Sequence, residues 1–89
     1  MNQRCVADIA GPWVEQQFDS GLIQRCRRYW NVPVDELPNE ALATYLRQRI
    51  ALVITIPEAE RRIGANFVDD TELYDGELVT ALEIARREL

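Results

Sequence analysis

The chain has 89 residues, of which 47% are hydrophobic, and fifteen acidic residues against ten basic ones give it a net charge of −5. This length and apolar fraction indicate one small domain over residues 1–89, and no apolar run reaches the roughly 18 residues that a membrane-spanning helix needs. The acidic balance disfavours nucleic acid as a partner, because phosphate binding needs a basic face.

A short first helix is expected to begin at Gly11-Pro12, because proline suits the first turn of a helix. Residues 5–9 before it are either another turn of helix or an ordered arm. The apolar side of the expected helix consists of Trp13, Val14 and Phe18.

A second helix is predicted over residues 21–30, with Ser20 as its N-cap. The apolar side chains of this helix share one face, which carries Leu22, Cys26, Tyr29 and Trp30. Prolines disfavour helix in the residues before them, so residues 31–39, which contain Pro33 and Pro38, are expected to form a connection with one turn at residues 35–37.

The longest helix is expected to start after an Asn39 cap and to cover residues 40–54. Its apolar stripe has spacings of four, four and three and consists of Leu42, Leu46, Ile50 and Val53. The β-branched residues 53–56 could instead form a short strand. We favour the helix, because the sequence offers no obvious partner strand.

Two further helices complete the expected fold. The sequence "TIPE" is a capping box, in which Thr55 caps a helix and Glu58 reaches back to it; Gly64 would end that helix. A last helix is predicted over residues 76–87, capped by Asp75. Its apolar stripe consists of Leu78, Leu82, Ala85 and Leu89. These patterns together predict an all-α single-domain bundle of about five short helices.

Catalytic and metal chemistry find little support in the residues present. The chain has no histidine, its four glycines are scattered, and its only cysteines, Cys5 and Cys26, form no metal-binding pair. An EF-hand register placed on Gly76 fails, because its twelfth position would be Leu82. We therefore expect no enzyme activity, no metal and no cofactor. The N-terminal residues lack the apolar block of a secretion signal, so a cytoplasmic protein is expected.

The acidic stretch "DDTELYDGE" over residues 69–77 is the candidate site. Between residues 63 and 85 the chain has six acids and no basic residue, so one surface should be negative and should attract a basic protein partner. The predicted protein-binding residues are Asp69, Asp70, Glu72, Tyr74, Asp75 and Glu77. Helix capping is the competing interpretation of the same acids. The arginines of "QRCRRYW" are interpreted as a solvated, salt-bridged face, with single-stranded nucleic acid as the alternative.

Three motifs within residues 29–82, "LRQRIAL", "IPEA" and "DDTELYDGEL", resemble a family of small proteobacterial proteins. Some members of that family are labelled immunity proteins of contact-dependent growth inhibition systems. The use of arginine without lysine also favours a GC-rich bacterial genome. The resemblance implies a stoichiometric binder that covers the active surface of a toxin domain, often a basic nuclease. The alternative is a helical module that forms a homodimer or another oligomer, again without catalysis.

Overall fold

The computed structural model describes residues 4–15, 20–67, 69–72 and 76–87. The elements in chain order are α1 (Val6–Ala10), α2 (Gly21–Arg28), a 3-10 turn η1 (Val34–Glu36), α3 (Asn39–Arg47), α4 (Leu52–Gly64) and α5 (Glu77–Arg87). Within these ranges no strand is present, although an isolated bridge joins Cys5 and Pro33. The predicted all-α fold is confirmed, and η1 forms the predicted turn one residue earlier than expected.

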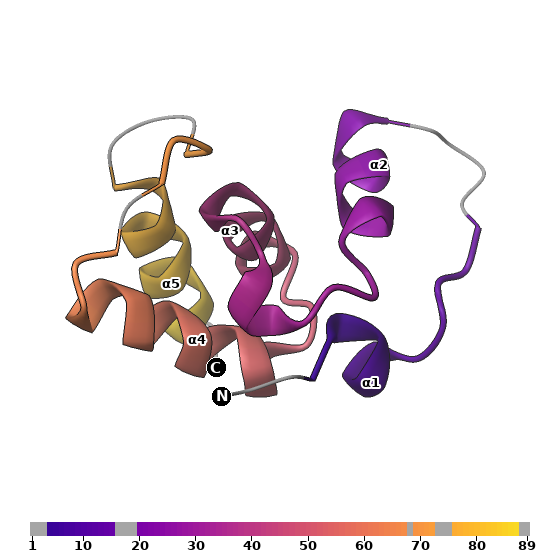
Figure 1. Ribbon diagram of the computed structural model, residues 1–89, viewed down its shortest axis with the longest axis horizontal. Helices are drawn as coiled ribbons and strands as arrows, with labels where there is room; N and C mark the ends of the chain where they lie inside the picture. Colours follow the sequence, from indigo (N-terminus) through magenta and orange to yellow (C-terminus); the bar gives the residue numbers. More distant parts are fainter. Residues whose placement is uncertain (1–3, 16–19, 68, 73–75, 88–89) are drawn as a thin grey trace.

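Helix α3 is the centre of the molecule (Figure 1). It packs against α4 and α5 on one side and against α2 on the other. Residues 41–46 are all buried, and Leu42 and Leu46 are fully buried, as the predicted stripe requires. The predicted stripe of α5 is likewise buried at Leu78, Leu82 and Ala85, whereas Leu89 lies outside the described residues.

The first helix lies at Val6–Ala10, where another turn of helix was one of the two expected alternatives, and not at Gly11-Pro12. The carboxylate of Asp8 accepts a hydrogen bond of 2.9 Å from the N–H of Cys5 and so caps α1. Gly11 then ends α1 with a φ of +88°, a conformation that glycine adopts without steric cost. The prediction of a helix beginning at Gly11 is therefore wrong over the described residues 11–15.

The segment after α1 is anchored by two tryptophans. Trp13 packs edge-on against Trp30 with ring centroids 5.0 Å apart. The indole N–H of Trp30 donates to the carbonyl oxygen of Gly11 at 2.8 Å. Val14, predicted to lie on an apolar helix side, is 71% exposed, and Phe18 lies outside the described residues.

Helix α2 agrees with the prediction in its start and in most of its buried face. The hydroxyl of Ser20 accepts a hydrogen bond of 3.2 Å from the N–H of Ile23. Cys26 and Trp30 are buried, but Leu22 remains exposed. The helix ends at Arg28, so Trp30 reaches the core from the turn that follows it.

The predicted long helix is in fact two helices. α3 ends at Arg47 in a Schellman motif, where the N–H of Ile50 donates to the carbonyl of Tyr45 (2.9 Å) and that of Arg49 donates to Leu46 (3.1 Å). Arg49 occupies the left-handed position of this motif with a φ of +57°, and Ala51 follows at +53°. The reversal sends α4 back across the core and leaves Val53, predicted to be buried, 62% exposed.

The interior of α4 differs from the predicted capping box. Residues 53–56 are helical, so the strand interpretation is wrong. Thr55 is buried inside α4 and donates its hydroxyl to the carbonyl of Ala51 at 3.2 Å, so it is no cap. Pro57 occupies an exposed position and removes one intrahelical hydrogen bond to the carbonyl of Val53. Because both residues are exposed, water can solvate that carbonyl.

Candidate functional site

The acidic stretch begins in a loop, residues 69–72, that lies against the start of α3. The carboxylate of Asp69 accepts hydrogen bonds from the backbone N–H of Asn39 (2.9 Å) and from the N–H and hydroxyl of Thr71 (3.0 and 2.6 Å). The hydroxyl of Thr71 accepts in turn from the N–H of Glu40 at 2.9 Å. Two side chains of the loop therefore cap α3, and the predicted Asn39 cap is wrong because Asn39 is already helical.

The environment of Asp69 holds it in its charged form. Burial alone would raise the pKa of this carboxyl, but the hydrogen bonds from the Thr71 side chain and the Asn39 N–H keep the pKa below its ordinary value. An ionised carboxylate at the N-terminus of α3 is also favoured by the helix dipole. Asp69 thus stabilises the fold whatever else it contacts.

The remaining acids of the candidate site have different surroundings. One oxygen of Glu72 accepts from the N–H of Leu78 at 2.9 Å and caps α5. Glu77 is fully buried and pairs with Arg47 at 2.7 Å. Asp70 is exposed. Tyr74 and Asp75, including the predicted Asp75 cap, lie outside the described residues. Helix capping therefore accounts for Asp69 and Glu72, while a role of these residues in protein binding stays a prediction.

Phe67 lies between the end of α4 and the acidic loop, and the sequence analysis did not predict a role for it. α4 ends in a second Schellman motif, in which Asn66 has a φ of +56° and the N–H of Phe67 donates to the carbonyl of Arg62 at 2.8 Å. This motif places the Phe67 ring over the guanidinium of Arg62, 5.4 Å from the ring centroid. The ring remains 49% exposed. An asparagine two residues after Gly64, Asn66, was the available sequence signal.

A small hollow lies beside this ring, between the end of α4 and the start of α5. Its volume is about 180 Å³. Its lining is mostly apolar, with one carboxylate, and consists of Ile63, Asn66, Phe67, Glu72, Gly76, Leu78 and Val79. Phe67 and Val79 are exposed there, while Leu78 belongs to the core. We call this site the Phe67 hollow.

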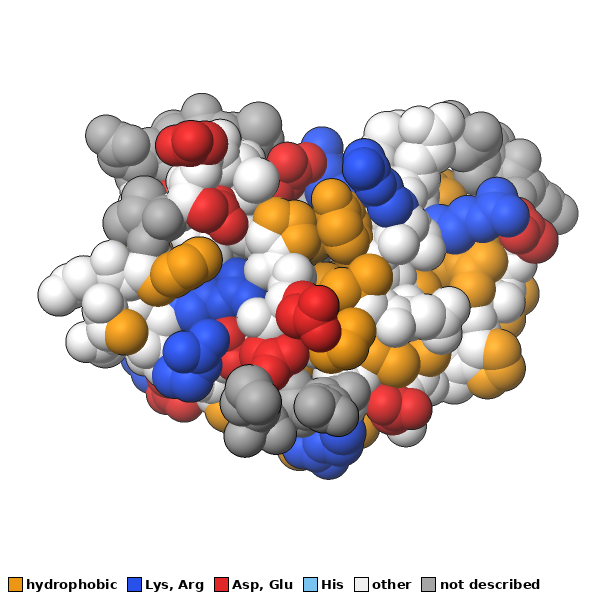
Figure 2. Space-filling model, viewed as in Figure 1, with side chains coloured by type: hydrophobic (Ala, Val, Ile, Leu, Met, Phe, Trp, Pro, Cys, Tyr) orange, Lys and Arg blue, Asp and Glu red, His pale blue; other side chains and the backbone are white. Residues whose placement is uncertain are grey.

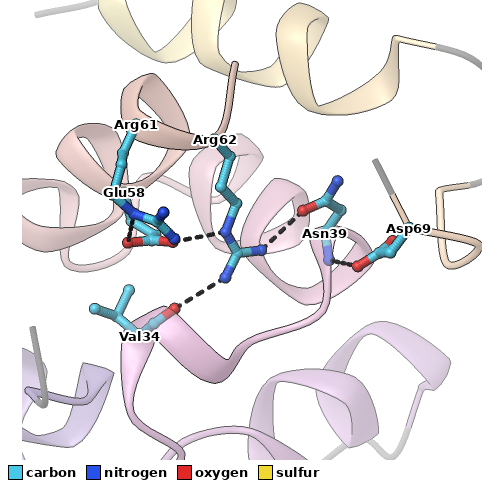
Figure 3. A network of polar contacts seen from close by, with 6 residues as sticks. All are labelled: Val34, Asn39, Glu58, Arg61, Arg62 and Asp69. Carbon is cyan, nitrogen blue, oxygen red and sulfur yellow. Dashed lines mark hydrogen bonds and ion pairs between the residues drawn. The ribbon is translucent and has the colours of Figure 1, made fainter. Parts of the chain in front are cut away.

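Arg62, which contacts the Phe67 ring, is the centre of a buried polar network (Figure 3). Arg62, only 2% exposed, donates to Glu58 at 2.7 Å, to the side-chain oxygen of Asn39 at 2.8 Å and to the carbonyl of Val34 at 3.3 Å. Burial tends to raise the pKa of Glu58, but hydrogen bonds from Arg61 and Arg62 outweigh it and lower the pKa. Glu58, predicted to reach back to Thr55, instead neutralises this buried cation.

Charged side chains lie over several parts of one face. Figure 2 shows acidic side chains over the segment between α4 and α5, basic side chains around α2, and a mixture of both over α4. Two arginines of α2 form salt bridges, Arg25 with Glu40 at 2.5 Å and Arg27 with Glu15 at 3.1 Å. This agrees with the salt-bridged face predicted for "QRCRRYW".

Two other hollows lie near α2. One of about 390 Å³ is polar and open and includes Arg25 and Arg28; the other, of about 270 Å³, is apolar and lies between Trp13, Ile23 and Ile50. Across the described ranges, no group of three or more acidic, cysteine or histidine side chains could hold a metal ion. None of the helices in those ranges is long and apolar enough to cross a membrane.

The structure defines a small all-α domain with an acidic capping loop and a small hollow at the ends of its helices. A sequence model of the family described as CDI immunity proteins, where CDI is contact-dependent growth inhibition, matches residues 10–89, and the chain belongs to this family. The family expected from the sequence motifs is thereby confirmed, and it implies a binding role with a toxin protein as partner. No curated protein and no solved structure matches the chain.

Proposed function

We propose that this protein neutralises a CDI toxin domain by binding to it stoichiometrically and covering its active surface. The observation that carries the proposal is the family match over residues 10–89. Neutralisation by binding requires surface complementarity and no catalytic group of its own. The absence of histidine from the sequence agrees with such a role.

The surface that we propose for the toxin is the acidic loop, residues 69–72, together with the start of α5. Asp70 is exposed, and Glu72 uses one carboxylate oxygen for its cap, so the other oxygen has lone pairs for a partner. A negative surface raises the association rate of a basic protein. The proposed partner is therefore a toxin domain with a basic surface. Glu77 is buried in a pair with Arg47, so it supports this surface without contacting the toxin itself.

The first test is to search the source genome for a toxin gene directly upstream of this one and to measure protection from the toxin domain that it encodes. We expect co-expression to restore growth of cells that make the toxin, and calorimetry of the purified pair to give one-to-one binding. Growth arrest in the presence of the folded protein, together with no measurable binding, would refute the proposed function.

The charge of the interface is tested by a variant that leaves the fold intact. Asp70→Asn with Glu72→Gln removes two charges, and the glutamine oxygen can still cap α5. Glu77 is left unchanged because it is buried. The matched control, Glu15→Gln with Glu36→Gln, removes two exposed charges outside residues 63–85. We expect only the first variant to slow association and to flatten its salt dependence, since the Debye length falls from about 10 Å at 0.1 M salt to 3 Å at 1 M.

A homodimer that buries the acidic loop is the alternative assembly. Sedimentation of the purified protein distinguishes the two, because the proposed binder presents this surface freely before it meets the toxin. A dimer that the Asp70→Asn, Glu72→Gln variant dissociates or tightens would favour the structural oligomer.

A further inference from the structure

We infer that the Phe67 hollow receives one long basic side chain, an arginine or a lysine, from the toxin domain. This inference rests on the proposed function, because the toxin supplies the side chain. In the bound state the aliphatic stem lies against Phe67 and Val79, and the cationic head pairs with Glu72.

The first support is the fixed position of the aromatic ring. The Schellman motif at Asn66 sets the backbone at Phe67, and Arg62 contacts the ring at 5.4 Å from its centroid. Arg62 is in turn held by Glu58 and by Asn39. A ring held in this way loses little conformational freedom on binding, and preorganised aromatic residues are typical binding hot spots.

The second support is the size of the hollow. Sites for small-molecule ligands have volumes of roughly 300–1,000 Å³. At about 180 Å³ the Phe67 hollow is smaller than this range, and it is open to the surface beside Val79. A single side chain presented by a protein partner suits this volume better than a free metabolite does.

The third support is the combination of an apolar lining with a negative edge. Ile63, Phe67 and Val79 offer apolar surface, while Glu72 offers a carboxylate at the same hollow. Lysine and arginine side chains bury their aliphatic stems along apolar surface and keep their charged heads near polar groups. Arg62, the basic residue that contacts the Phe67 ring, is itself buried and paired with Glu58.

The test measures how tightly three single variants bind the toxin domain that the wild-type protein neutralises. Phe67→Ala removes the aromatic wall, Glu72→Gln removes the charge but keeps the cap acceptor, and Val53→Ala truncates an exposed apolar residue of α4 as the control. We expect Phe67→Ala to raise Kd by about 30-fold, Glu72→Gln by about 10-fold, and Val53→Ala by less than about twofold. Circular dichroism of each variant establishes that it is folded. Phe67→Leu, which keeps an apolar wall, should recover part of the affinity.

The possible outcomes separate this inference from the proposed function. If the wild-type protein binds the toxin but Phe67→Ala behaves like Val53→Ala, the Phe67 hollow is not part of the interface. If Phe67→Ala weakens binding while Glu72→Gln does not, the occupant is an apolar side chain and the basic one is refuted. If the wild-type protein does not bind the toxin at all, both proposals are overturned.

Discussion

The carboxylate of Asp69 caps a helix that begins 30 residues earlier, by accepting the backbone N–H of Asn39 at 2.9 Å. Most N-caps come from the residue immediately before the helix, which here is Pro38 and has no side-chain acceptor. The acidic loop therefore supplies what the local sequence lacks. This relation joins the start of α3 to the region proposed for toxin binding.

Removing the cap should destabilise the protein by a measurable amount. Asp69→Ala deletes the acceptor for Asn39 and Thr71, and the expected loss is about 0.5–2 kcal/mol of unfolding free energy in urea titrations. Asp70→Ala is the matched control and should change stability by less than about 0.5 kcal/mol, because Asp70 is exposed. Equal losses in both variants would contradict the capping role of Asp69.

Stability should also decline in acid because of two carboxyl groups. The folded-state pKa values of Asp69 and Glu58 lie below the ordinary values of 3.8 and 4.5, so both groups bind protons more readily in the unfolded chain. Their contribution is complete above these ordinary values and is lost as pH falls below them and through the lowered folded-state values. Urea midpoints between pH 7 and pH 2.5 measure this decline. The Asp69→Asn variant should show a shallower decline; an identical pH profile would argue against a contribution from Asp69.

The core stripe of α3 gives a prediction about packing. Leu46 is fully buried at the centre of the molecule, so Leu46→Ala should cost about 2–5 kcal/mol in chemical denaturation. Val53→Ala serves as the control, because that side chain is 62% exposed and its truncation creates no cavity. A loss below roughly 1 kcal/mol at Leu46 would show that the stripe does not carry the core.

The network around Glu58 predicts that losing its carboxylate costs much more stability than losing Arg61, the exposed arginine that contacts the same carboxylate. Glu58→Gln leaves the guanidinium of Arg62 buried without its counter-charge, which typically costs about 3–5 kcal/mol. For a domain of this length the whole stability is roughly 4–13 kcal/mol, so this variant should be close to unfolding.

Arg61→Gln is the matched control for that variant. Arg61 contacts the same carboxylate, but its side chain is 60% exposed, so its loss should cost less than about 1 kcal/mol. Thermal and urea denaturation of the two variants would measure the difference. Comparable losses in both would mean that burial of Arg62 does not govern the energetics of this network.

Local signals in the sequence were sufficient for much of the fold. Ser20 marks the start of α2, and the stripe of α5 is buried where its period of three and four predicts. The break between α3 and α4 was missed because Arg49 and Ala51 adopt left-handed backbone conformations that usually require glycine or asparagine. The periodic stripe continued through this break and so suggested one helix.

The candidate site was predictable only in part. The acidic stretch stands out in the sequence, but the partners of Asp69 and Glu77 come from α3, about thirty residues away, and no local pattern identifies them. Glu77 was expected at the surface and is buried. The Phe67 hollow depends on how α4 and α5 meet, which is a tertiary relation that helix periodicity does not describe.

The distant cap of α3 has a consequence for the order of events during synthesis. As the ribosome releases the chain from its N-terminus, α3 leaves the exit tunnel long before Asp69 and Thr71 are available to it. Its first N–H groups must be satisfied by water until the loop at residues 69–72 arrives and docks. The nascent α3 is therefore incomplete at its start, and the last third of the chain is needed to finish a helix that the middle third encodes.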